Sequence, residues 1–431
     1  MASAQLVEPG WLTARRERAV ALKGELELPS FRGVPGWEFF DLEGLELDGY
    51  AVAPANGVAA PAGLAGSLFR PQKGATDLHV QVDGTPISGK DHPVADGDAA
   101  AAGEPIVMPL SRAVVEHPEL VERHLGSLVG VDDPFVAHNE ADWTGGAFVH
   151  VPAGRKLERP VLLWALQKAT ASVLPWRALI VLEENAEAEV WEQYSSVGSP
   201  AGLVNSVVEV SVGPGARLRY LCGQELAEDS WLFSTQRAEL ARDATLEWVA
   251  LGFGGGRGRV RMETKLAGRG ASAKVTGAYA SHARQRLDFD TRQEHAAPNT
   301  TSDLAFRGVL ADRSTAVWRG MIRVDPGAQQ TDAFQESRNL LLSKRAHADA
   351  IPGLEIEAND VRCTHAAAIA QVDSEQLFYL RARGLPYPLA QRLIIDGFMQ
   401  ALVERFPEGA AHDAVSQALE RRLQTVLGSI D

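Results

Sequence analysis

The stretch NSVVEVSVGPGARLRYL, residues 205–221, contains the pattern that decides the fold. Apolar residues alternate with polar ones on both sides of Gly213-Pro214-Gly215, and Ala216 closes the turn. A period of two is typical of a β-strand with one buried face, and Gly and Pro between two such runs mark a tight turn. The segment therefore predicts a strand, a short turn and a second strand.

The same outline recurs from about residue 145 to residue 371, and the repeats contain no helical segment. We expect a continuous parallel β-helix, a β-solenoid in which each coil stacks on the next. A β-sandwich with Greek-key loops has similar short strands and is the alternative. We favour the solenoid because the turns recur in the same phase. Their spacing begins near 28 residues and shortens to about 18, so the repeat is degenerate; the small residues that close the turns are Ala186, Ala216, Ala244, Ala271, Ala328 and Ala346.

Helical segments are expected on both sides of this β region. Residues 1–140 form a mixed N-terminal part with helical patterns in WLTARRERAVALKGELELP and SRAVVEHPELVERHLGSLV, an aromatic cluster in PGWEFFDLEGLEL, and an irregular stretch at 51–104. Residues 141–371 form the β-helix core, and residues 372–431 form a small helical domain. Asp373 or Ser374 can cap its first helix, and Gly384 can end that helix.

The composition narrows the class of protein. The chain has 431 residues, of which 45% are hydrophobic, and its 56 acidic and 42 basic residues give a net charge of −14. This charge argues against nonspecific nucleic-acid binding and against an anionic membrane as the main partner. There is no apolar run of membrane-spanning length and no secretory pattern at the N-terminus. We expect a cytoplasmic protein with reduced thiols, because two cysteines do not suggest a disulfide framework.

The segment DVRCTHAAA, residues 360–368, places Cys363 two positions before His365. On a strand, residues i and i+2 face the same way, so thiol and imidazole could act together; on a helix they would diverge. Both groups are good ligands for iron and zinc, but two ligands are too few to hold a metal tightly, so a partner chain would have to complete the site. The alternative is that Cys363 is a small buried hydrophobe and His365 a hydrogen-bonded side chain.

Two enzyme classes are alternatives to a scaffold. A cysteine nucleophile activated by histidine would need an orienting group and an oxyanion hole, and the sequence displays neither. Many parallel β-helix proteins act on polysaccharides, and the segment RLDFDTRQEH could line a groove with Asp288, Asp290, Arg292 and Glu294. A secreted lyase would normally carry a signal peptide.

A family resemblance rests on residues 335–403 and extends over about 140–405. The segment resembles the SufB/SufD family of iron–sulfur cluster assembly scaffolds, and is most similar to its SufD members. The matching positions are Asn339-Leu340-Leu341-Leu342-Ser343, Pro352, Leu354-Glu355-Ile356, Cys363-x-His365, Phe378-Tyr379-Leu380 and Arg383-Gly384.

The resemblance implies a right-handed parallel β-helix and a place in a SufBCD complex as a subunit without turnover of its own. It implies a heterodimer with SufB through the end strands of the two β-helices, where Cys363 and His365 would contribute to a transient iron–sulfur cluster shared with SufB. It also implies that the ATPase SufC binds the C-terminal helices; we expect the contacts at Phe378, Tyr379, Leu380 and Arg383, because aromatic and arginine side chains dominate interface energetics.

Two positions depart from the family pattern, since Ala366 and Ala370 stand where glycines are usual. The cysteine-rich N-terminal features of many SufB chains are also absent, which favours SufD over SufB. Four matters stay open on the sequence: an inert structural role for the Cys-x-His pair, whether His365 binds iron directly or a sulfur species, homodimerisation in isolation, and flavin binding by a complex.

Overall fold

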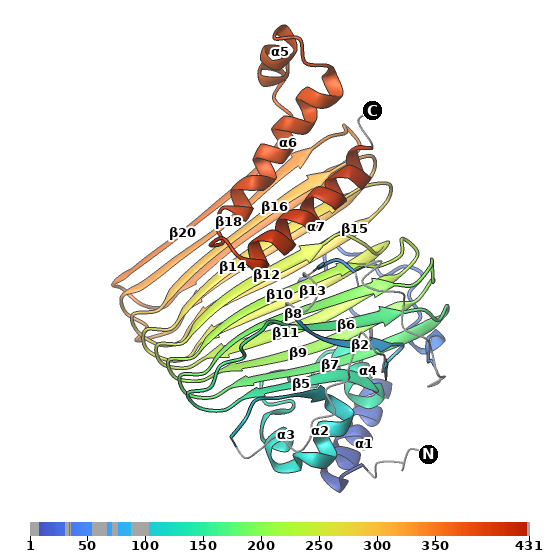
Figure 1. Cartoon of the computed structure of the whole chain (residues 1–431), viewed down its shortest axis with the longest axis vertical. Coiled ribbons are helices and arrows are strands. Elements are labelled where there is room, and N and C mark those ends of the chain that lie inside the picture. Colours follow the sequence, from blue (N-terminus) through green and yellow to red (C-terminus); the bar gives the residue numbers. More distant parts are fainter. Residues whose placement is uncertain are drawn as a thin grey trace.

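A parallel β-helix forms the body of the molecule in the computed structural model (Figure 1). The structure describes residues 8–30, 34, 36–53, 67–70, 76–87 and 103–428. Most of the segment 51–104, which the sequence predicts to be irregular, therefore lies outside the described residues. The two walls of the β-helix are two ten-stranded sheets, and successive strands of the chain alternate between them.

The first sheet carries the odd-numbered strands of the β-helix. They are β5 (Gly145–Val151), β7 (Ser172–Leu182), β9 (Leu203–Val212), β11 (Trp231–Leu240), β13 (Arg257–Leu266), β15 (Arg286–His295), β17 (Thr315–Val324) and β19 (His347–Ile356), with β4 (Ile106–Pro109) and β1 (Ala51–Val52) beside the first of them. The second sheet carries β6 (Val161–Gln167), β8 (Glu187–Ser196), β10 (Arg217–Glu225), β12 (Thr245–Gly252), β14 (Ser272–Ser281), β16 (Thr301–Leu310), β18 (Thr331–Leu341) and β20 (Val361–Gln371), preceded by β2 (Asp77–Val82) and β3 (Thr85–Pro86).

Strand pairing is parallel throughout, except for the short pairs β2–β3 and β4–β5. This excludes the sandwich with Greek-key crossings, because Greek-key strands pair antiparallel. The strands run from Gly145 to Gln371, which confirms the expected β-helix.

The repeat is more regular than the sequence suggested. From β8 onward the even-numbered strands begin at residues 187, 217, 245, 272, 301, 331 and 361, so one coil takes 27 to 30 residues. The apparent shortening to 18 residues arose because Ala328 and Ala346 belong to two different series of turns. Ala328 leads from β17 into β18, whereas Ala346 leads from β18 into β19 on the opposite side of the coil.

Each expected alanine closes a β-turn. Its backbone N–H donates to the carbonyl three residues earlier, at 3.1–3.2 Å, as in Ala216 to Gly213 and Ala346 to Ser343. The residue before Ala186 and before Ala244 is Asn185 and Asp243, with φ of 55° and 57°. Asn and Asp tolerate this left-handed conformation better than other non-glycine residues, which explains why they stand at these turn positions.

The N-terminal part closes one end of the β-helix. Helix α1 (Gly10–Glu25) packs on α4 (Pro134–Asp142), and α2 (Leu110–Glu116) packs on β5, next to α3 (Pro118–His124). Residues 36–50, which we call the N-terminal strap and which include the short helix η1 (Leu47–Gly49), run along the outer face of the first sheet.

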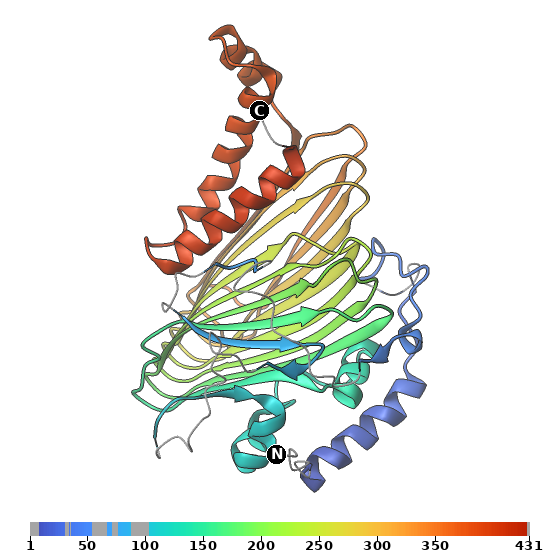
Figure 2. The ribbon, with the colours of Figure 1, turned by 45° about the vertical axis from the view of Figure 1, so that its right-hand side comes forward.

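The C-terminal part lies on the other sheet. Helices α6 (Tyr387–Val403) and α7 (Ala410–Leu427) bury an apolar face, including Ile395, Met399 and Leu419, against outward residues of the second sheet such as Val309 (Figure 2). Helix α5 (Ser374–Ala382) extends beyond the last coil and buries none of its residues. Asp373 caps α5 by accepting a hydrogen bond from the Glu375 N–H at 2.8 Å, and Gly384 follows the helix with φ of 91°, as expected from the sequence. No helix among the described residues is long and apolar enough to cross a bilayer.

Candidate functional site

The last coil of the β-helix leaves one end of the solenoid open. Within the described chain, β19 pairs with β17 alone and β20 pairs with β18 alone, so both strands have a free edge (Figure 1). A free edge presents unpaired backbone N–H and C=O groups, which are a template for pairing with another chain. The opposite end is covered by α2, α4 and the strands beside them.

Cys363 and His365 lie on β20, at positions that face the same side of the strand. In the parallel register Cys363 stands beside Ala333, and His365 beside the buried Gln335. Cys363 packs against the apolar cluster that includes Ile322 and Val324, so this face is the one turned toward the inside of the coil. His365 is exposed because no further coil covers it.

The Cys363 thiol is partly shielded and carries its proton at neutral pH. Burial and the nearby Asp332 carboxylate both raise the pKa of Cys363 above the ordinary thiol value of 9.0. A thiol must lose its proton to bind a metal, so a cation delivered to this site would have to displace it. Cys363 and Cys222 form no disulfide in the structure.

The pair does not make a complete metal site within this chain. No group of three or more His, Cys, Asp and Glu side chains in the described part of the chain could hold a metal ion. Structural and catalytic metal centres take three or four protein ligands. Cys363 and His365 could therefore supply only part of a coordination shell.

Apolar side chains surround the open end. Leu354 and Ile356 on β19 and Ile369 on β20 are 37%, 41% and 44% exposed. Clustered apolar exposure of this kind marks an interaction surface more often than a free one. Ala366 and Ala370 lie on the opposite face of β20, where the family pattern has glycines, and both fit the strand without interrupting it.

The expected contact residues on α5 are also accessible. Phe378 and Tyr379 are 75% and 55% exposed, and Leu380 is half-buried. The Arg383 guanidinium lies over the Tyr379 ring at 3.5 Å from the centroid, which holds both side chains in place. A shallow groove beside α5 is lined by Phe378, Tyr379 and Leu380 together with Ile394.

The charged row proposed for a polysaccharide groove is not a set of free carboxylates. Asp288 is buried and Arg259 donates to it at 2.9 Å; the same arginine donates to Asp290 at 2.9 Å. Glu294 lies 4.0 Å from Arg237. The Arg292 guanidinium alone among the four side chains forms no hydrogen bond or ion pair with the described residues.

Sequence reasoning missed a polar cluster inside the β-helix. The Glu192 carboxylate is fully buried and accepts hydrogen bonds from the Trp176 indole at 2.7 Å, the Tyr220 hydroxyl at 2.6 Å and the Tyr194 hydroxyl. Burial raises the pKa of Glu192, although these donors oppose the shift. Beside it, Cys222 receives the Trp248 indole N–H at 3.4 Å, and burial raises the pKa of its thiol to about 12.

The comparisons with known proteins agree on one family. Residues 165–398, more than half of the chain, match the family described as "SUF system FeS cluster assembly, SufBD core domain". The chain is 29% identical to the iron–sulfur cluster assembly protein SufD of Bacillus subtilis over 97% of this chain and 95% of that protein. It is 27% identical to SufB of the same organism, over 68% of this chain and 64% of SufB.

A third relative is an iron–sulfur cluster assembly SufBD family protein of Mycobacterium tuberculosis, 28% identical over 76% of this chain and 84% of that protein. The match to the core domain spans the coils from β6 to β20 and continues into α6, so it includes the open end with Cys363 and His365. The chain belongs to the SufBD family of iron–sulfur cluster assembly proteins.

Proposed function

We propose that this chain is a SufD-like subunit of a SufBCD assembly complex, in which it pairs with SufB and contributes to a composite site where an iron–sulfur cluster is built. The observation that carries the proposal is the open last coil, where Cys363 and His365 lie beside a free strand edge and exposed apolar side chains. The cluster is the cargo of this site.

Pairing through the last coil is supported by backbone and side-chain chemistry together. The free edges of β19 and β20 can each accept a strand, which satisfies their unpaired N–H and C=O groups. Burial of Leu354, Ile356 and Ile369 in the same contact adds hydrophobic stabilisation. A homodimer in isolation would use the same surface, so SufB has to compete for it.

The roles of the two candidate ligands differ. His365 is exposed and a neutral imidazole can bind iron without first losing a proton. Cys363 has to exchange its proton for the metal, and the raised pKa of its thiol makes that exchange less favourable. We therefore assign the larger contribution to His365, with the remaining ligands supplied by SufB.

Energy for assembly would come from ATP hydrolysis in SufC, bound at the C-terminal helices; the chain itself would be non-catalytic. Phe378, Tyr379 and Arg383 form an exposed aromatic and cationic patch on a helix that buries none of its own residues. Such a helix gains most of its stability from packing against another surface, which supports a partner at this position.

The test is co-purification of this chain with SufB and SufC, followed by anaerobic reconstitution with iron and sulfide and by absorption and Mössbauer spectroscopy. His365→Ala should leave the complex intact, because it removes an exposed side chain, and should reduce the amount of cluster formed. Cys363→Ser should have a smaller effect in the same direction.

The matched control is His347→Ala, which removes another exposed histidine near the same end, on β19. It should leave cluster formation unchanged. If His365→Ala and Cys363→Ser both form clusters as the unmodified complex does, the pair is inert and the composite site is wrong. Failure of SufB to bind at all would refute the subunit assignment itself.

A further inference from the structure

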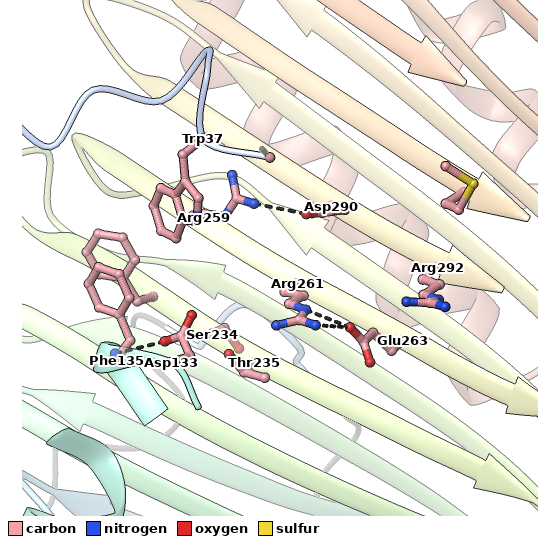
Figure 3. Close-up of a pocket in the computed structure, with 13 residues that line it drawn as sticks. Trp37, Asp133, Phe135, Ser234, Thr235, Arg259, Arg261, Glu263, Asp290 and Arg292 are labelled. Carbon is pink, nitrogen blue, oxygen red and sulfur yellow. Dashed lines mark hydrogen bonds and ion pairs between the residues drawn. The ribbon is translucent and has the colours of Figure 1, made fainter. Parts of the chain in front are cut away.

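A second concave site lies on the outer face of the first sheet (Figure 3). Its floor is formed by outward-facing side chains of β11, β13 and β15, and its rim by the N-terminal strap and the start of α4. The cavity has a volume of about 300 Å³, which is at the small end of the range for sites that hold metabolites.

One end of the cavity is aromatic. The Phe135 and Phe233 rings stack with centroids 3.9 Å apart, and Trp37 of the strap stacks on Phe135 at 5.6 Å. Arg259 covers the Trp37 ring at 4.1 Å and so fixes the strap over the sheet. These rings offer an apolar wall to a ligand without needing to move.

The other end of the cavity is charged, and its carboxylates already have donors. Asp290 receives Arg259 at 2.9 Å, and Glu263 receives Arg261 at 2.6 Å. Asp133 accepts the N–H groups of Phe135 and Val136 at 2.8 and 3.2 Å as the cap of α4. Figure 3 shows the arginine pairs on the floor of the cavity; Arg292 lies beside Glu263, and no interaction is drawn to it.

Arg292 differs from the other two arginines of the cavity, because its guanidinium is not paired with a carboxylate of the described residues. Its side chain is half-buried, and its Nε atom is shielded from solvent with no hydrogen-bond partner among the described residues. Neither a hydrogen bond nor an ion pair joins its guanidinium to any other residue that the structure describes. Glu263 stands beside Arg292 on the next strand but is paired with Arg261. A shielded guanidinium N–H without a hydrogen-bond partner is costly, and an anion that enters the cavity would relieve that cost.

We propose that this cavity binds a small monocarboxylate whose carboxylate pairs with Arg292 and whose apolar or aromatic body lies toward Trp37 and Phe135. The planar guanidinium matches a carboxylate in a two-point contact. The Thr235 hydroxyl, which also lines the cavity and has no partner among the described residues, can donate to the same anion.

The charges in the cavity select a carboxylate over a phosphate. Among the described residues, Arg292 is the one arginine of the lining whose guanidinium has no hydrogen bond or ion pair, so it can pair with one negative charge of a ligand. A phosphate monoester carries nearly two negative charges at neutral pH and would face three carboxylates, those of Asp133, Glu263 and Asp290. Like charges at such distances disfavour binding.

The experiment is a titration of the full chain with benzoate, followed by isothermal calorimetry and saturation-transfer NMR. Benzamide serves as the neutral analogue of the same shape, and inorganic phosphate as the competing anion. Benzoate should bind saturably, and benzamide and phosphate at least about tenfold more weakly. Arg292→Gln should weaken benzoate by about tenfold to a hundredfold, because a charge-assisted contact is lost, and Arg292→Lys by less.

The matched control is Arg286→Gln, which removes an exposed arginine from the same strand and leaves the cavity lining intact. It should bind benzoate as the unmodified chain does. The proposal is overturned if benzoate does not bind, if Arg292→Gln and Arg286→Gln bind it equally, or if phosphate binds more tightly. A thermal midpoint that falls more for Arg292→Gln than for Arg286→Gln would assign Arg292 a structural role and would also overturn it. None of these outcomes depends on SufB or SufC.

Discussion

Replacing Arg177 by Met tests how the closed end of the β-helix is held. Arg177 on β7 is fully buried and donates to Glu140 of α4 at 2.6 Å and to Glu209 of β9 at 2.7 Å. Both carboxylates are buried as well. Met fills a similar volume but has no charge, so the substitution leaves two carboxylates without their shared cation.

The expected loss of stability depends on the hydrogen bonds that Glu140 and Glu209 retain when Arg177 is removed. Loss of one partner from a buried ion pair costs about 3–5 kcal/mol. Glu140 keeps a hydrogen bond from Arg15 at 2.7 Å. Glu209 keeps three backbone donors, the N–H groups of Gly126, Leu128 and Val129, at 2.8–3.1 Å. Since these contacts remain, we place the expected cost near the lower limit, at about 3 kcal/mol.

The pH dependence has a definite sign. Burial alone would raise the pKa of Glu140, but the Arg177 and Arg15 guanidinium groups outweigh it and hold that pKa below the ordinary value of 4.5. A carboxyl whose pKa is lowered on folding stabilises the protein above its unfolded pKa and loses that contribution as pH falls through the folded pKa. The difference between the unmodified chain and Arg177→Met should therefore shrink in acid, below about pH 4.5.

The assay is urea unfolding followed by circular dichroism, together with hydrogen exchange of α4 and of residues 126–129. A loss of about 3 kcal/mol corresponds to roughly hundredfold faster exchange in these segments. The control is Arg219→Met, since Arg219 also bridges two carboxylates, Glu189 at 3.0 Å and Glu247 at 2.7 Å, but on a partly exposed surface. That change should cost no more than about 1 kcal/mol. Equal effects of the two substitutions would refute the reasoning that burial sets the cost.

Three further predictions concern the interior, the thiols and the C-terminal helices. In urea unfolding, Glu192→Gln should stabilise the protein more at about pH 8 than at about pH 5. Burial raises the pKa of Glu192, so the unmodified chain loses stability as pH rises from the unfolded-state pKa toward the folded-state pKa. A stabilisation that does not depend on pH would contradict this. Iodoacetamide at about pH 8 should label Cys363 and not Cys222, as read by mass spectrometry. Cys222 is buried and the pKa of its thiol is raised to about 12, whereas Cys363 is only partly shielded. Labelling of Cys222 in the folded chain would contradict this prediction. Phe378→Ala should leave the thermal midpoint unchanged, because the side chain is exposed, and should weaken SufC binding by about 1–3 kcal/mol in calorimetry. An unchanged affinity would show that SufC does not bind at Phe378.

The coil was predictable from sequence because its cause is local. Alternation within a strand, and a left-handed residue before five of the six closing alanines, are read within a few positions, as at Asp243 and Ala244. The error at Ala346 arose because a turn sequence does not state on which side of the coil it lies. To assign the side, one must know how many strands lie between two turns. One strand, β18, lies between Ala328 and Ala346, so these two turns are on opposite sides of the coil.

The outer cavity could not be predicted from sequence, because its parts are separated by long stretches of chain. Trp37 was recognised as part of an aromatic cluster, yet nothing near it indicates that Arg259 and Phe135 lie against it. The same limit applies to Glu192: alternation assigns polar residues to the outside of a strand, whereas three donors from neighbouring side chains allow this carboxylate to lie inside. Cys363 and His365 could be proposed as a pair from sequence because their spacing is local.

The two ends of the β-helix differ in a way that bears on the assembly role. A solenoid exposes its interior and its strand edges at each end unless something covers them, so stable solenoids carry caps. Here the first coils are covered by α4, which is fastened through Arg177, Glu140 and Glu209. The last coil has no equivalent cover among the described residues, because α6 and α7 lie on the outer face of the second sheet and α5 extends past the end.

An open end of this kind presents free strand edges, which are a template for pairing with another chain. The inner face of β20 would then be closed by the partner, and Cys363 and His365 would pass from the solvent-exposed rim of one chain to the interior of a two-chain solenoid. Under the proposed function an incomplete ligand set at this place would have a use, because the described residues of this chain alone offer too few ligands to hold iron there. Assembly of the cluster would thereby depend on formation of the complex, and a chain without its partner would not capture free metal at this position.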